Sequence, residues 1–221
     1  MKTTIRSCSV IIGCALGLLA LPQTGNSQGF YLDVHAGGAI AQDVDLKKML
    51  VNTPGAELDL KPGMHLNVGG GYNINQYFAV QLDTGFIYNR IDNLKQSDGD
   101  DGYGALRHIP MVAELVFRYD KPDSKWVPFA GLGAGADWSI LALDDIQAPN
   151  GAVVDGLAGD VVFAWQAFAG VRYKFTQNMT LGGGYKFYWA DGAEWDVDGP
   201  GSIETGHAII HTLGVDFTMT F

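Results

Sequence analysis

The sequence is poor in basic residues, in cysteine and in long hydrophobic segments. Lysine and arginine number 14 against 24 aspartates and glutamates, and the net charge of −10 argues against nucleic acid, because phosphate recognition needs a basic face. No run of eighteen uncharged apolar residues follows the N-terminal segment, which excludes membrane-spanning helices. An apolar content of 47% excludes global disorder. At 221 residues the chain is long enough for one complete β-barrel or β-sandwich.

The N-terminal segment has the three parts of a secretory signal peptide. Lys2 and Arg6 give it a positive start, residues 10–21 are apolar, and small or polar residues follow. We therefore expect a signal peptide at residues 1–27 and a single mature domain at residues 28–221. Removal of the two basic residues takes the net charge from −10 to −12.

Both cysteines of the chain lie within the predicted signal peptide. The mature chain would then have no disulfide and no thiolate metal site, because Cys8 and Cys14 are removed. The residues before Cys14 superficially resemble a lipoprotein processing site, but the apolar run continues to Leu21, which favours ordinary cleavage.

The mature chain shows an alternation of apolar and polar residues with period two, which is typical of strands with two different faces. In the last segment, for example, Leu213 and Val215 alternate with Thr212 and Asp216. Strands of ten to fifteen residues suit a tilted crossing of a hydrocarbon layer. We predict eight such strands, at 30–40, 64–73, 77–89, 105–119, 125–138, 161–175, 179–189 and 207–221.

The predicted connections alternate between long and short, as in outer-membrane barrels, whose periplasmic turns are short and whose extracellular loops are long. A soluble barrel such as a lipocalin would keep its polar residues outward, whereas here the apolar face carries aromatics near the strand ends. A soluble β-sandwich that buries those aromatics is the alternative. The long connections are 41–63, 91–104, 139–160 and 190–206, and the short ones are 74–76, 120–124 and 176–178.

We therefore predict an all-β fold, an eight-stranded antiparallel up-and-down transmembrane β-barrel in a bacterial outer membrane. In hydrocarbon every backbone N–H and C=O must be paired, and a closed barrel leaves no free edge. Outer-membrane lipid is then the first expected partner. We expect a monomer.

The end of the chain and several glycine-aromatic segments give it a family resemblance. The chain resembles the OmpA-like and opacity-type outer-membrane β-barrel superfamily of Gram-negative bacteria over residues 28–221, without a peptidoglycan-binding domain. The weaker features are the glycine-rich segments 69–72, 131–135 and 182–187. The resemblance implies that the alternating end, with its terminal Phe, is a signal read by the barrel-assembly machinery during insertion. The residues of this assembly signal are Leu213, Val215, Phe217, Met219 and Phe221.

The inward faces of the predicted strands gather eight charged residues in the lumen. One interpretation is a gate or a cation-preferring constriction. The other, which we favour, is a salt-bridge network that fills the barrel, because eight strands leave an interior just wide enough for side chains. A buried charge without a partner would be costly, so these groups must be paired or hydrated. The predicted lumen charge network is Asp33, Asp83, Glu114, Arg118, Asp137, Arg172, Lys186 and Asp216.

Seventeen of the 24 acidic residues lie in the four long connections. Divalent-cation binding is one interpretation, but no complete calcium loop is present, and a solvated outer surface is favoured. His207 and His211 lie near the outer end of the last strand, where a histidine with a serine and an acid could act on lipid acyl chains. No matching serine spacing is present, so we predict no catalytic residue, no metal and no cofactor.

These observations predict a structural or surface-interaction role, in adhesion or envelope integrity, through the acidic extracellular loops. Loops on a rigid scaffold are the usual place for recognition, so an extracellular surface partner is expected there. A narrow porin or ion channel is the alternative, and a lipid A-modifying enzyme is the third interpretation.

Overall fold

The structure, a computed structural model, describes residues 29–49, 51–94, 103–121, 123–147, 153–197 and 201–221. Their regular secondary structure consists of strands alone. Within these described ranges no helix is long and apolar enough to cross a membrane. The predicted signal peptide, residues 1–27, lies outside them.

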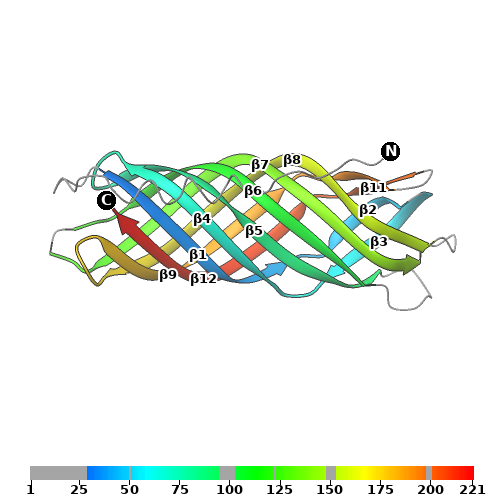
Figure 1. The fold of residues 1–221 in the computed structure, drawn as a ribbon, viewed down its shortest axis with the longest axis horizontal. Coiled ribbons are helices and arrows are strands. Elements are labelled where there is room, and N and C mark those ends of the chain that lie inside the picture. The colour runs from blue at the N-terminus through cyan, green and yellow to red at the C-terminus, as the bar shows by residue number, and fades with distance from the viewer. Residues whose placement is uncertain (1–28, 50, 95–102, 122, 148–152, 198–200) are drawn as a thin grey trace, which may run out of the picture.

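Eight long strands form one closed barrel, as predicted (Figure 1). Each is antiparallel to both neighbours, and β1 closes the ring by pairing with β4 on one side and β12 on the other. The remaining pairs follow in the order β4–β5–β6–β7–β8–β9–β12. The eight strands are β1 (Gly29–Ala41), β4 (Gly63–Asn73), β5 (Phe78–Leu94), β6 (Tyr103–Arg118), β7 (Trp126–Gln147), β8 (Val153–Lys174), β9 (Met179–Ala190) and β12 (Ala208–Thr220).

The period-two pattern of the sequence gives the barrel its two faces. Along β4, buried and exposed residues alternate from His65 to Asn73, because successive side chains in a strand point to opposite sides of the sheet. Leu82 and Leu213 on the outer face are each 70% exposed, although both are fully apolar. An apolar outer face of this kind is what the hydrocarbon of a membrane requires.

Aromatic side chains surround the barrel at the end with the short turns. Trp126 is 59% exposed, so these rings point away from the barrel and not into a core, which removes the β-sandwich alternative. Neighbouring rings touch across strands, with centroids 5.1 Å apart for Phe30 and Tyr72 and 5.0 Å apart for Trp126 and Tyr173. They form the aromatic girdle of the periplasmic interface.

The expected loops 41–63 and 190–206 were predicted wrongly, because each contains a hairpin. The first holds β2 (Val44–Met49) and β3 (Val51–Leu60), and the second holds β10 (Glu194–Val197) and β11 (Gly201–Thr205). β3 pairs with the end of β5, and β11 pairs with β2. The two hairpins therefore extend the sheet beyond the ends of β1, β4, β9 and β12.

The connection predicted at 139–160 is also largely strand. β7 and β8 each have 22 residues and pair along almost their whole length, as far as Gln147 with Val153. A strand of that length covers about 70 Å, well beyond the apolar band of about 25 Å that a barrel presents to lipid. The excess lies at the end where Figure 1 shows β2, β3 and β11, opposite the C-terminus.

The interior has two zones that differ in polarity. Toward the short turns it contains buried charged and polar side chains, whereas toward the long connections it is filled by a hydrophobic cluster around Trp195, Tyr188 and Ile210. Each of these three side chains is at most 1% exposed. Side chains from the hairpins, such as Val44 and Ile203, complete this cluster.

Candidate functional site in the lumen

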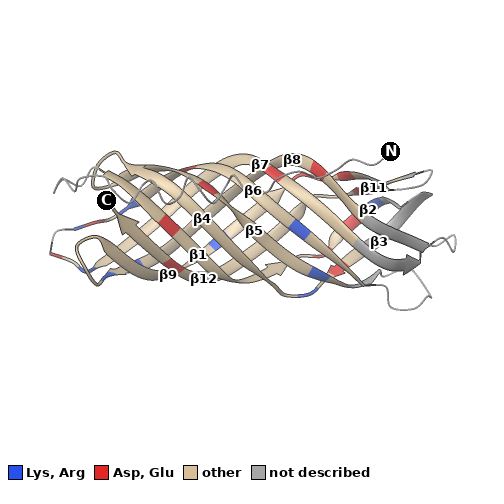
Figure 2. Ribbon diagram, viewed as in Figure 1, with Lys and Arg blue, Asp and Glu red and all other residues tan. Residues whose placement is uncertain are grey.

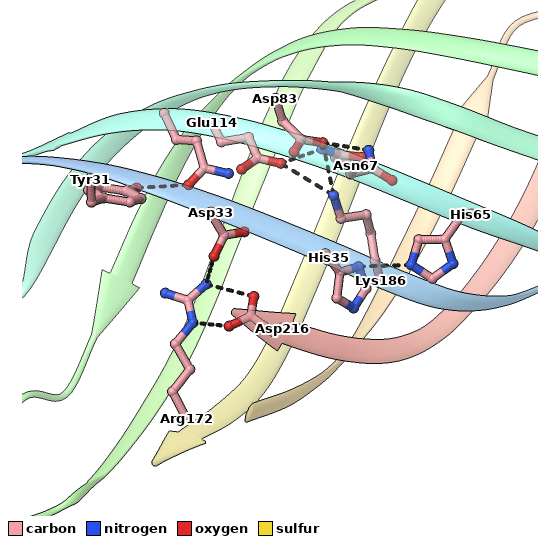
Figure 3. Close-up of polar contacts among 12 residues, drawn as sticks. Tyr31, Asp33, His35, His65, Asn67, Asp83, Glu114, Arg172, Lys186 and Asp216 are labelled. Carbon is pink, nitrogen blue, oxygen red and sulfur yellow. Dashed lines mark hydrogen bonds and ion pairs between the residues drawn. The ribbon is translucent and has the colours of Figure 1, made fainter. Parts of the chain in front are cut away.

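Arg172 on β8 is the centre of the first charged cluster in the lumen (Figure 3). Its guanidinium donates from Nη2 to Asp33 Oδ2 at 2.9 Å and to Asp216 Oδ2 at 2.9 Å, and from Nε to the other oxygen of Asp216. Thr218 donates from its hydroxyl to Asp33 Oδ2 at 2.8 Å, and the centre of the Phe129 ring lies 4.1 Å from the guanidinium carbon of Arg172. This fork geometry fixes β8 against β1 and β12.

Lys186 on β9 is the centre of the second cluster. Its ammonium lies 3.0 Å from Asp83 Oδ2 on β5 and 3.7 Å from Glu114 Oε1 on β6. Two amides complete the contacts: Asn67 donates to Asp83 Oδ2 at 2.8 Å, and Gln166 donates to Glu114 Oε1. The cluster therefore ties together five strands of the barrel.

The space between the two clusters is nearly filled. A cavity of about 20 Å³ lies there, bordered by Asp33, Glu114, Lys186 and Asp216. One water molecule needs about 10–15 Å³ on this measure, so this cavity has room for about one water. Side chains fill this level of the lumen, as expected for eight strands.

The structure places two residues of the predicted network outside both clusters. Asp137 on β7 accepts a hydrogen bond from His108 Nδ1 at 2.6 Å, on the side of the hydrophobic cluster. Arg118, at the end of β6, donates to the backbone carbonyl of Asn75 at 3.0 Å beside a short turn. The predicted set is thus divided into two clusters and two separate residues.

A histidine pair lies beside the Lys186 cluster and was not proposed from the sequence. His65 Nε2 and His35 Nδ1 are 2.9 Å apart, and His65 Nδ1 lies 3.2 Å from the carbonyl of Gly38 (Figure 3). Both residues have inward parity on paired strands, so the alternation places them in the lumen. Their contact depends on the register of β1 against β4, in which Gly37 faces His65, and the alternation alone does not give it.

The histidines near the outer end of β12 lie among aromatic groups. His211 Nδ1 is 2.6 Å from the Tyr185 hydroxyl, His211 Nε2 is 3.2 Å from Gln42 Nε2, and the His207 ring stacks on Trp189. Among the residues that the structure describes, neither ring has a serine or a carboxylate among its contacts. Across the described part of the chain, no group of three His, Cys, Asp or Glu residues is placed to hold a metal ion.

The predicted assembly signal lies along the outer face of β12. Leu213 and Val215 are strongly exposed there, and the Phe221 N–H donates to the Phe30 carbonyl at 2.9 Å. That the barrel-assembly machinery recognises this segment stays a prediction.

The comparisons with known proteins agree with this architecture. The family model of the outer membrane protein beta-barrel domain matches residues 11–217. The fold is similar to that of Neisserial surface protein A, at 19% identity and a TM-score of 0.53, over 87% of this chain and 97% of that chain. It is also similar to OprG from Pseudomonas aeruginosa, at 13% identity and a TM-score of 0.59, over 88% and 98% of the two chains. No curated protein sequence matches the chain.

Proposed function

Because the chain belongs to the outer membrane protein β-barrel family and is located in the bacterial outer membrane, we propose that it acts as a closed barrel that presents an extracellular extension of its wall. Its role is then structural or interactive, in surface adhesion or envelope integrity. The membrane-spanning part serves as an anchor and not as a conduit.

The filled lumen is the observation that supports this proposal. The two ion-pair clusters together connect seven of the eight strands, and the cavity between them has a volume of about 20 Å³. The hydrophobic cluster fills the lumen beyond them, toward the long connections. An ion would have to break the contacts of Arg172 or Lys186 and then cross an apolar core, where it would lose its hydration without new ligands.

The extracellular part of the wall supports an interactive role. β7, β8 and the two hairpins extend far beyond the length needed to cross the bilayer, and the bilayer does not require this extension. Most of the acidic residues lie in these regions, which gives the outer surface a high negative charge. A rigid, charged projection of this kind suits contact with an external surface.

Liposome swelling tests the closed lumen with uncharged solutes. Liposomes that contain the refolded protein should swell in arabinose no faster than empty liposomes, while liposomes with a general porin swell rapidly. Swelling that increases with the amount of folded protein would contradict the proposal and favour the porin alternative.

Shortening the outer wall tests the interactive role. Residues 144–155, the outermost part of the β7–β8 hairpin, would be replaced by a two-residue turn between the paired residues Leu143 and Gly156, and the shortened protein would be expressed in a strain that lacks the wild type. Attachment to epithelial monolayers and sensitivity to detergent are the two readouts. Reduced attachment supports a surface role, and increased sensitivity supports an envelope role. If neither readout changes, the extension has no such function.

A further inference from the structure

Two arginines lie side by side on the outer face of the barrel, on the neighbouring strands β5 and β6. In the register of these strands Arg90 faces Ala105 and Arg107 faces Tyr88, so the arginines are diagonal neighbours, with Cα atoms about 7 Å apart. The adjacent residues Asn89 and Leu106 are buried in the interior, which places both arginine side chains outside. Figure 2 shows the basic positions of β5 and β6 on the same side of the barrel.

The position of these arginines along the strands corresponds to the outer headgroup region. On β5 the outward side chains from Phe78 to Tyr88 span eleven residues, and on β6 those from Ile109 to Phe117 span nine. A membrane-crossing strand needs about 9–11 residues. Arg90 lies two residues after Tyr88, and Arg107 lies two residues before Ile109, so each is the next outward residue beyond the apolar stretch of its strand. Anionic headgroups meet the protein at this level.

Neither arginine has an acidic partner among the residues that the structure describes, although the chain is strongly acidic. Arg107 lies with its guanidinium carbon 5.8 Å from the centre of the Tyr88 ring, and its Nε is buried without a hydrogen-bond partner. Arg90 is exposed beside it.

We propose that Arg90 and Arg107 bind the phosphate of a lipid headgroup in the outer leaflet. The guanidinium group presents donors in a planar fork that matches phosphate oxygens, and two such groups on adjacent strands can hold one phosphate between them. The Tyr88 ring holds Arg107 in place through a cation–π contact. The lipid chains of the same molecule would lie along the apolar face formed by Phe86 and Met111.

Binding of diphosphoryl lipid A to the refolded barrel in detergent, followed by native mass spectrometry, tests this site. The double variant R90Q/R107Q should bind the lipid about tenfold more weakly or worse, since hydrogen bonds between charged groups are lost. The affinity of the single variant R107K for lipid A should lie between those of the wild type and R90Q/R107Q, because an ammonium group keeps the charge but lacks the planar set of donors.

Lys121 and Lys125 provide the matched control at the opposite end. Each lies over a tyrosine ring, as Arg107 does, and a hydrogen bond from Lys121 to Tyr119 raises the pKa of the Lys121 ammonium. The variant K121Q/K125Q removes the same charge from the periplasmic rim and should bind lipid A like the wild type. Heat-dependent mobility on gels verifies that every variant is folded.

Inorganic phosphate at millimolar concentration distinguishes the two sources of the ligand group. Competition supports a site that accepts phosphate without its lipid chains, and lack of competition supports a site specific for the membrane-bound headgroup. Wild-type affinity of R90Q/R107Q for lipid A, or an equal loss in K121Q/K125Q, would overturn the proposal.

Discussion

At the scale of single residues, the barrel depends on a few buried contacts whose loss nothing nearby can replace. Arg172 holds two carboxylates, and among the described residues it is the cation in salt-bridge contact with both of them. Glycines have an equally local role: a Cβ atom at Gly71 would overlap the Tyr31 ring, whereas one at Gly70 meets nothing within 4 Å.

Replacement of Arg172 by Met should lower the free energy of unfolding by about 3 kcal/mol, because Asp33 and Asp216 lose their counter-charge in a buried site. Urea unfolding in lipid vesicles, followed by tryptophan fluorescence, measures this change. Adding Asp33→Asn and Asp216→Asn to the same chain should restore much of the loss. An unchanged unfolding midpoint in the single variant would show that the cluster contributes nothing to stability.

The two adjacent glycines give a matched pair of substitutions. Gly71→Ala should destabilise the barrel by about 1–3 kcal/mol, since the Tyr31 ring must move and its hydrogen bond to Gln81 is disturbed. Gly70→Ala adds the same methyl group on the open outer face and should leave the unfolding midpoint within error of the wild type. Equal effects of the two substitutions would contradict the packing account.

At the scale of elements, a buried tryptophan adds to the strand pairing that attaches the hairpin β10–β11 to the barrel. Trp195 is 1% exposed and donates from its indole N–H to the Ser139 carbonyl on β7 at 3.1 Å. Trp195→Ala should weaken this attachment, since truncation of a buried tryptophan costs about 3–5 kcal/mol. Proteases added to intact cells should then cleave within residues 190–206 faster than in the wild type. Trp126→Ala, at the exposed opposite end, is the control, and equal cleavage rates would exclude the attachment.

The eight spanning strands were predictable because the membrane imposes a strict alternation and a minimum length on each. The hairpins were not, because their pairing is non-local: β11 pairs with β2, far away in the sequence. The upper part of β7 contains Asp144 and Asp145 in succession, which in isolation favours a loop, and only its pairing with β6 and β8 makes it strand.

The same limit applies to the lumen. The alternation along each strand indicated which side chains face inward. It could not say that Arg172 contacts Asp33 and Asp216 while Lys186 contacts Asp83, because the depth of each residue depends on the stagger of all eight strands. Asp137 and Arg118 share the inward parity and lie at other depths.

At the scale of the whole molecule, the interior of the barrel is charged toward the short turns and apolar toward the long connections. The charged zone ties the strands together within the membrane, and the apolar zone joins the hairpins to the projecting wall. In the function that we propose, these two zones leave no continuous column of water, and the protein is an anchor with a rigid extracellular extension.

Single-channel recording of the refolded protein in a planar bilayer tests whether the lumen is closed. We expect no conductance steps from verifiably folded and inserted wild-type barrels, at low salt and at high salt. Discrete conductance steps in the wild type, whose size or ion selectivity changes when Glu114 or Lys186 is neutralised, would contradict this expectation and identify the lumen as a channel.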